Sequence, residues 1–103
     1  MMVVRIWRGR ILSKDADAYY PYIEETGLRA FRNTPGNRGA FLLRRGDGEI
    51  DEMLVVSLWD SLESIGAFAG DDIERAVYYP EDEKYLLELD PNVTHYDVLE
   101  HWF

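Results

Sequence analysis

The pattern of apolar and polar positions divides the chain into strand-like and helix-like segments. Apolar residues alternate with charged ones over residues 3–11, and apolar stretches of strand length occupy residues 39–45 and 50–59, which predicts three strands. A fourth strand is predicted over residues 93–99. The Asp-Gly pair at 47–48 favours a tight turn, so the second and third strands are predicted to form a hairpin.

A first helix is predicted between the first two strands. Residues 16–30 place apolar side chains at helical spacing, with acidic residues turned to the other side. Pro21 has no N–H to donate, so either the helix starts late with Asp17 as its cap or it is kinked at the proline.

Further helical segments are predicted between the third and fourth strands. Residues 60–70 form a second helix, for which Asp60 and Glu63 have the spacing of a capping box. Residues 71–76 are predicted to add a short helical turn. Residues 80–89 are predicted to be mostly helical, because they begin with a proline and three acidic residues that suit a helix N-terminus.

This order of elements predicts an α+β, ferredoxin-like split βαβ fold, in which a four-stranded antiparallel sheet carries its helices on one face. The chain, residues 1–103, is expected to form a single domain. The third strand is apolar on both faces: Leu54, Val56 and Leu58 on one, Met53, Val55 and Trp59 on the other. A monomer would expose one face to water, so we predict a homodimer joined through the sheet faces, with Val55 facing the interface.

Composition and charge exclude several kinds of binding partner and chemistry. Twenty acidic against eleven basic residues give a net charge of −9, which repels a phosphate backbone and argues against nucleic acid. The absence of cysteine excludes disulfides, thiolate nucleophiles and cysteine-bound zinc. The longest apolar run, residues 53–58, is interrupted by Ser57 and is far shorter than the roughly 18 residues of a membrane span. With no signal-peptide pattern at the start, we expect a cytoplasmic protein without membrane contact.

Four segments carry a family resemblance that covers nearly the whole chain. They are WDSLES at 59–64, FAG at 68–70, AVYYPEDE at 76–83 and VTHY at 93–96. In these segments the sequence resembles the antibiotic biosynthesis monooxygenase-like domains of the dimeric α/β-barrel superfamily. The resemblance implies a dimeric α/β barrel, a fold that hosts cofactor-free oxygenases, heme-degrading enzymes, isomerases and members of unknown role.

The same resemblance bears on the cofactor. The heme-degrading relatives use an asparagine, a tryptophan and a histidine, and that histidine lies on a helix. Here Phe68 occupies the stretch of the second helix where many members carry a histidine, and the first strand has no asparagine. This departure argues against heme, and we expect no cofactor.

Aromatic residues are abundant on the elements that would surround the gap between sheet and helices. We predict that this gap binds a flat organic ligand, lined by Tyr19, Trp59, Phe68, Tyr78, Tyr79 and Tyr96, together with His95. The alternative for each aromatic residue is a place in the hydrophobic core. Their number on these elements, rather than any single position, favours the ligand.

His95 is the candidate catalytic residue, because a neutral imidazole on a half-buried strand could act as a base toward a phenolic substrate. The alternative is a packed histidine bonded to Tyr96, Asp97 or a backbone carbonyl. His95 and Asp97 share a strand face, yet two ligands do not make a metal site, so none is predicted.

Charged residues raise two further questions. Arg5, Arg8 and Arg10 could hold an anionic substrate, but alternating arginines on a strand of so acidic a chain more often pair with carboxylates. The acidic run 81–83 is expected to cap a helix and face solvent.

Two functions follow. The first is a cofactor-independent monooxygenase that acts on a small aromatic or quinol-type substrate, with Tyr19 and Trp59 packing the substrate and His95 polarising it. The second is a non-catalytic, dimeric small-molecule binding or stress-associated protein of the same fold, which the phenylalanine at position 68 favours.

Overall fold

A computed structural model describes all residues 1–103 and contains one four-stranded antiparallel sheet. In the sheet the strands lie in the order β2-β3-β1-β4. Their bounds are β1 Val3–Leu12, β2 Asn37–Gly46, β3 Ile50–Trp59 and β4 Thr94–Asp97. With its helices, this sheet confirms the predicted α+β ferredoxin-like fold. The β2–β3 hairpin is also confirmed, and Gly48 in its loop has a φ of +112°, which glycine adopts readily.

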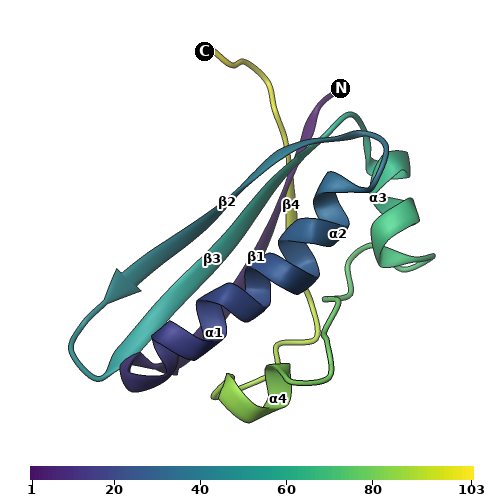
Figure 1. Cartoon of the computed structure of the whole chain (residues 1–103). Coiled ribbons are helices and arrows are strands. Elements are labelled where there is room, and N and C mark those ends of the chain that lie inside the picture. Colours follow the sequence, from purple (N-terminus) through teal and green to yellow (C-terminus); the bar gives the residue numbers. More distant parts are fainter.

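One long helical stretch follows β1 and runs along the sheet (Figure 1). It begins with the 3₁₀ turn η1 Ser13–Asp15 and continues through α1 Ala16–Ile23, the π-helical turn η2 Glu24–Leu28 and α2 Arg29–Arg32. The helix predicted over residues 16–30 is therefore present. Pro21 lies inside α1 rather than at its start, so the late start capped by Asp17 does not occur.

The next helix is α3, Leu62–Ala69, at the α2 end of the long stretch (Figure 1). Its capping box is formed by Ser61 and Ser64 rather than by Asp60 and Glu63 as predicted. Ser61 accepts a hydrogen bond from the Ser64 N–H, and the Ser64 hydroxyl accepts one from the Ser61 N–H, each at 3.2 Å. Asp60, the residue before this N-cap, instead forms an ion pair with Arg38.

Residues 71–93 contain far less helix than predicted. Only α4, Asp82–Tyr85, forms in the region predicted as a helix over residues 80–89. The chain then turns back to the sheet, where Leu86 bridges Ile11 of β1 and the Leu87 N–H donates to the Arg10 carbonyl at 2.9 Å. Pairing with the free edge of β1 replaces the remaining helical hydrogen bonds.

The predicted helical turn over residues 71–76 is also replaced by extended pairing. Arg75 bridges Asn92, the Ala76 N–H donates to the Pro91 carbonyl at 2.9 Å, and the Val93 N–H donates to the Glu74 carbonyl at 2.8 Å. Residues 74–76 and 91–93 are therefore hydrogen-bonded to each other.

The two faces of the sheet differ in what covers them. On β3, the odd-numbered residues from Asp51 to Trp59 are all buried beneath the helices, and the even-numbered ones are half-buried on the other face. The prediction that both faces of this strand are apolar is correct. Val55, however, points to the helices and is 7% exposed, so its assignment to a dimer interface was wrong.

The face without helices, which we call the open face, carries Val4, Ile6, Phe41, Leu43, Leu54, Val56, Leu58 and Tyr96. Phe41 and Tyr96 are 58% and 57% exposed there. None of the helices combines the length and the apolar character that a membrane crossing requires.

Candidate ligand-binding site

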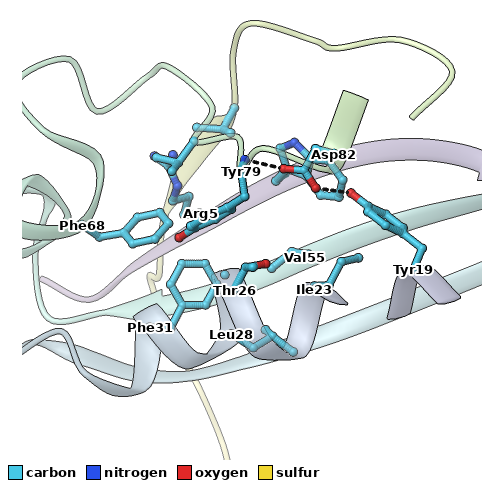
Figure 2. Close-up of a pocket in the computed structure, with 14 residues that line it drawn as sticks. Arg5, Tyr19, Ile23, Thr26, Leu28, Phe31, Val55, Phe68, Tyr79 and Asp82 are labelled. Carbon is cyan, nitrogen blue, oxygen red and sulfur yellow. Dashed lines mark hydrogen bonds between the residues drawn. The ribbon is translucent and has the colours of Figure 1, made fainter. Parts of the chain in front are cut away.

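A cavity of about 60 Å³ lies between the covered face of the sheet, the long helix and the segment after α3 (Figure 2). It is not closed off from solvent, and ten of its fourteen lining residues are apolar. The lining residues are Arg5, Trp7, Tyr19, Ile23, Thr26, Gly27, Leu28, Phe31, Val55, Phe68, Val77, Tyr79, Asp82 and Val93.

The π-helical turn η2 forms one wall of the cavity. Thr26, Gly27 and Leu28 all lie in this turn and all line the cavity. The Thr26 hydroxyl donates to the Tyr22 carbonyl at 2.8 Å, a side-chain bond that competes with the regular helical ladder. Single π-turns inside α-helices are frequent at functional sites, and here the wider turn faces the cavity.

An aromatic cluster forms the wall nearest α3. The ring centroid of Phe68 lies 4.7 Å from that of Phe31 and 6.0 Å from that of Trp59. Phe68 and Phe31 line the cavity, whereas Trp59 lies behind them with no exposed surface and donates its indole N–H to the Ser57 hydroxyl at 2.9 Å. Trp59 thus occupies a core position that supports the wall.

A buried tyrosine–carboxylate pair lies at the α1 end of the cavity (Figure 2). The Tyr19 hydroxyl donates to Oδ1 of Asp82 at 2.8 Å, and the Tyr79 backbone N–H donates to Oδ2 at 2.6 Å. Burial, and then the bond to Asp82, raise the pKa of Tyr19, so its hydroxyl keeps its proton and acts as a donor. Both carboxylate oxygens retain a lone pair that can accept from a ligand.

The position of Asp82 corrects the expectation that the acidic run 81–83 faces solvent. Asp82 is only 6% exposed, whereas Glu83 is exposed. Its bond to the Tyr79 N–H is local but does not cap α4, whose N-cap Glu81 has no side-chain hydrogen bond. Its bond to Tyr19 joins segments that are 63 residues apart. No local pattern distinguishes Asp82 from its acidic neighbours, so sequence reasoning missed it.

A buried arginine and a histidine lie side by side at the opposite end of the cavity. Arg5 of β1 pairs in register with His95 of β4, and Nη1 of Arg5 lies 3.2 Å from Nε2 of His95. Because the guanidinium has only donors, the His95 Nε2 accepts and the ring proton resides on Nδ1. Burial, and then the charge of Arg5, lower the pKa of His95, while Glu74 opposes this shift. His95 is therefore neutral at pH 7.

The other predicted ligand-binding residues lie in different places. Of the predicted set, Tyr19, Phe68 and Tyr79 line the cavity. Tyr78 lies beyond Trp7, whose indole N–H donates to its hydroxyl at 3.4 Å. Tyr96 is on the open face, and His95 reaches the cavity only through Arg5.

The residues of the site do not provide the ligands that a metal ion or heme needs. No group of three histidine, cysteine, aspartate or glutamate side chains gathers anywhere in the chain to hold a metal ion. The cavity wall contains no histidine, cysteine or methionine, and its Tyr19 hydroxyl is engaged by Asp82. A volume of about 60 Å³ is also smaller than the roughly 150 Å³ that accommodates benzene. The residues present do not fit heme as a resident group.

No family model matches the sequence, and none of the curated proteins matches it. Solved structures do share its fold. The heme-degrading protein of Mycobacterium tuberculosis in its heme-free form aligns with a TM-score of 0.69 and 21% identity over 100% of both chains. A protein from Bacillus cereus assigned as an antibiotic biosynthesis monooxygenase aligns with a TM-score of 0.70 and 12% identity, over 99% of this chain and 97% of that one. SnoaB, a cofactor-independent oxygenase from Streptomyces nogalater, aligns with a TM-score of 0.60 and 11% identity, over 97% of this chain and 95% of that one.

Proposed function

The chain has the fold of the antibiotic biosynthesis monooxygenase-like domains, and on that premise we propose that it is a cofactor-independent monooxygenase. Its substrate is a small aromatic or quinol-type molecule that lies partly in the cavity between sheet and helices and partly beyond the cavity's open side. The observation that carries the proposal is the buried Tyr19–Asp82 pair, which faces a wall of aromatic and aliphatic side chains. Apolar walls with a few convergent polar groups are typical of such sites.

The chemistry requires a base and a dry surrounding. A phenol or enol must lose its proton before it can pass an electron to O₂; one oxygen atom then enters the product and the other leaves as water. Asp82 lies in the cavity wall with lone pairs available, so we assign it the acceptance of that proton. Tyr19 holds the carboxylate in place, and the apolar wall limits access of water to the intermediate.

In this scheme His95 is not the catalytic base that the sequence predicts. Its Nε2 lone pair accepts from Arg5, so it is not free to take a substrate proton without breaking that bond. In our proposal His95 orients Arg5 and polarises the substrate only through it. This makes His95 a positioning residue.

We also propose a homodimer. The open face carries eight apolar side chains and no helix, and Phe41, Leu43 and Tyr96 there are 58%, 45% and 57% exposed. A contiguous apolar surface of this kind is unusual for a monomer, and a second copy related by a two-fold axis covers it with no other partner.

One observation favours the second candidate, a non-catalytic protein of the same fold that binds small molecules or is associated with stress. The cavity of about 60 Å³ is small, and Phe68 fills the wall where a polar group would serve catalysis. Such a protein would bind the same ligands and leave O₂ untouched.

An oxygen electrode separates the two candidates. The protein is tested with hydroquinones and anthrone-type phenols, and binding of each compound is measured in parallel by tryptophan fluorescence. The monooxygenase proposal predicts O₂ uptake that falls about 10²-fold or more in Asp82→Asn, with Arg8→Gln on the other sheet face as the unaffected control. Binding without O₂ uptake for every compound would reject the monooxygenase and support the binding protein.

A further inference from the structure

Arg5 is a buried cation without a carboxylate partner. It is 3% exposed, yet none of the six ion pairs of the chain includes it. Its guanidinium donates through Nη1 to the Ile73 carbonyl and through Nη2 to the Arg75 carbonyl at 3.0 Å. Nη1 also lies 3.2 Å from the neutral His95. Burying a charge is costly unless it is paired, and every partner of Arg5 is uncharged.

The neighbouring arginines of β1 show that acidic partners are not scarce. Arg8 pairs with Glu52 at 2.6 Å and Arg10 pairs with Glu88 at 2.8 Å, as the sequence predicts. The chain has twenty acidic residues against eleven basic ones. Arg5 therefore lacks a carboxylate partner because of where it lies, and not because the chain has too few acidic residues.

The unused donors of Arg5 lie on neighbouring nitrogens of its guanidinium. Arginine has five N–H donors, and the bonds to the two carbonyls and to His95 use three of them, all on Nη1 and Nη2. The remaining Nε–H and one Nη2–H donate to no protein atom. Arg10 uses the same Nε–Nη2 edge to hold both carboxylate oxygens of Glu88, at 2.8 and 3.0 Å. This fork matches a carboxylate bidentately.

The surroundings of this edge suit an aromatic ligand. Arg5 lines the cavity, and the Phe68 ring centroid lies 5.7 Å from its Cζ. Burial lowers the pKa of Arg5 to about 10, so it remains charged at neutral pH. Asp82 also lines the cavity, but it forms no ion pair with Arg5. The cavity thus has a cationic site at one end and a hydrogen-bond acceptor at the other.

We propose that Arg5 binds the carboxylate of a small aromatic acid, whose ring lies against Phe68 in the cavity. This inference rests on the proposed function for the location of the ligand, and it adds the charge of the ligand. The small volume favours a single ring, part of which extends through the open side of the cavity.

The test compares benzoate with benzamide, its uncharged counterpart of the same shape, at pH 7 by NMR titration. Benzoate is expected to bind in the millimolar range, as its few atoms allow, and about 10-fold or more tightly than benzamide. Arg5→Gln should reduce that preference to within about twofold and leave benzamide binding unchanged. Arg8→Gln, which removes an equal charge from the other face, should keep the preference.

A second measurement covers the case in which Arg5→Gln does not fold. In the wild-type protein the Arg5 Nε–H resonance should move on addition of benzoate and stay in place with benzamide. The inference is overturned by equal affinities for the two compounds, by a preference that survives in folded Arg5→Gln, by an unmoved Nε–H resonance, or by a benzoate Kd above about 10 mM.

The outcome is independent of turnover. A benzoate preference without O₂ uptake from any compound would leave this inference standing and reject the monooxygenase. O₂ uptake from neutral hydroquinones without any preference for benzoate would do the reverse.

Discussion

Replacing Phe68 tests whether the cavity has the rigid aromatic wall on which the account depends. Phe68 is half-buried on α3, and its ring packs against Phe31 and Trp59 with centroid distances of 4.7 and 6.0 Å. Phe68→Ala removes the ring; Phe68→Leu keeps most of the volume and removes only the aromatic contacts.

The contacts set the expected magnitudes. Each aromatic pair adds about 0.5–1.5 kcal/mol beyond its buried area, so loss of both pairs in Phe68→Leu should lower the free energy of unfolding by about 1–3 kcal/mol. Complete truncation of a buried phenylalanine costs about 3–5 kcal/mol. Because Phe68 is only half-buried, we expect the lower end of that range, about 3 kcal/mol, for Phe68→Ala.

The truncation also makes a binding prediction. The group removed is a phenyl ring, so the enlarged cavity should accept benzene, as engineered apolar cavities of about 150 Å³ do. Benzene at ten times its Kd would stabilise Phe68→Ala by about 1.4 kcal/mol. For a domain of this size each kcal/mol raises the Tm by about 4–8 °C, so this stabilisation corresponds to a rise of about 6–11 °C.

Urea and thermal denaturation with and without benzene provide the assay, with the wild-type protein and Phe68→Leu as controls at equal protein concentration. Benzene should raise the Tm of Phe68→Ala more than that of either control. A loss of stability below about 1 kcal/mol in Phe68→Ala, or no gain from benzene, would show that α3 moves to fill the space and that the wall is not rigid.

Three further predictions concern the dimer, the buried carboxylate and pH. Val56→Asp, on the open face, should halve the mass measured by light scattering to about the 12.0 kDa of one chain and leave the circular dichroism spectrum unchanged, whereas Val55→Asp should unfold the protein. An intact Val56→Asp dimer would exclude this face as the interface. Tyr19→Phe removes a bond to the buried Asp82 and should lower the free energy of unfolding in urea by about 1.5–3 kcal/mol; a loss under about 0.5 kcal/mol would mean that the bond is not formed. Because burial lowers the pKa of His95 below its ordinary 6.5, its share of stability is present above that pH and lost as the pH falls. His95→Gln should therefore flatten the decline in urea midpoint as the pH falls below about 6.5, and parallel curves would contradict this.

Apolar stretches of strand length and one turn signal were sufficient to predict most of the sheet. The strand over residues 50–59 was predicted with the observed bounds, because its apolar run over residues 53–56 has strand length and a glycine-containing turn precedes it. The segment over residues 80–89 was predicted as a helix from its N-terminal signals, which are genuine at Asp82–Tyr85. Its second half left the helix because Leu86 pairs with Ile11, a residue 75 positions away that no local pattern reveals.

The candidate site shows the same limit more strongly. Aromatic abundance correctly indicated the region between sheet and helices, and Tyr19, Phe68 and Tyr79 do line the cavity. Two charged residues give the cavity its chemistry. Asp82 was expected to face solvent, and for Arg5 a carboxylate partner was favoured over an anionic ligand. Burial by a distant segment distinguishes each of them from its neighbours, and burial of that kind exists only after the chain has folded.

The most direct test of the central claim, that the cavity between sheet and helices is the ligand site, is NMR mapping of amide resonances during titration with a hydroquinone. The largest shifts are expected at Thr26 and Gly27 of η2 and at Val93, because these two distant parts of the chain meet at the cavity. Largest shifts at Phe41 and Tyr96, on the open face, with unchanged resonances around the cavity, would contradict it.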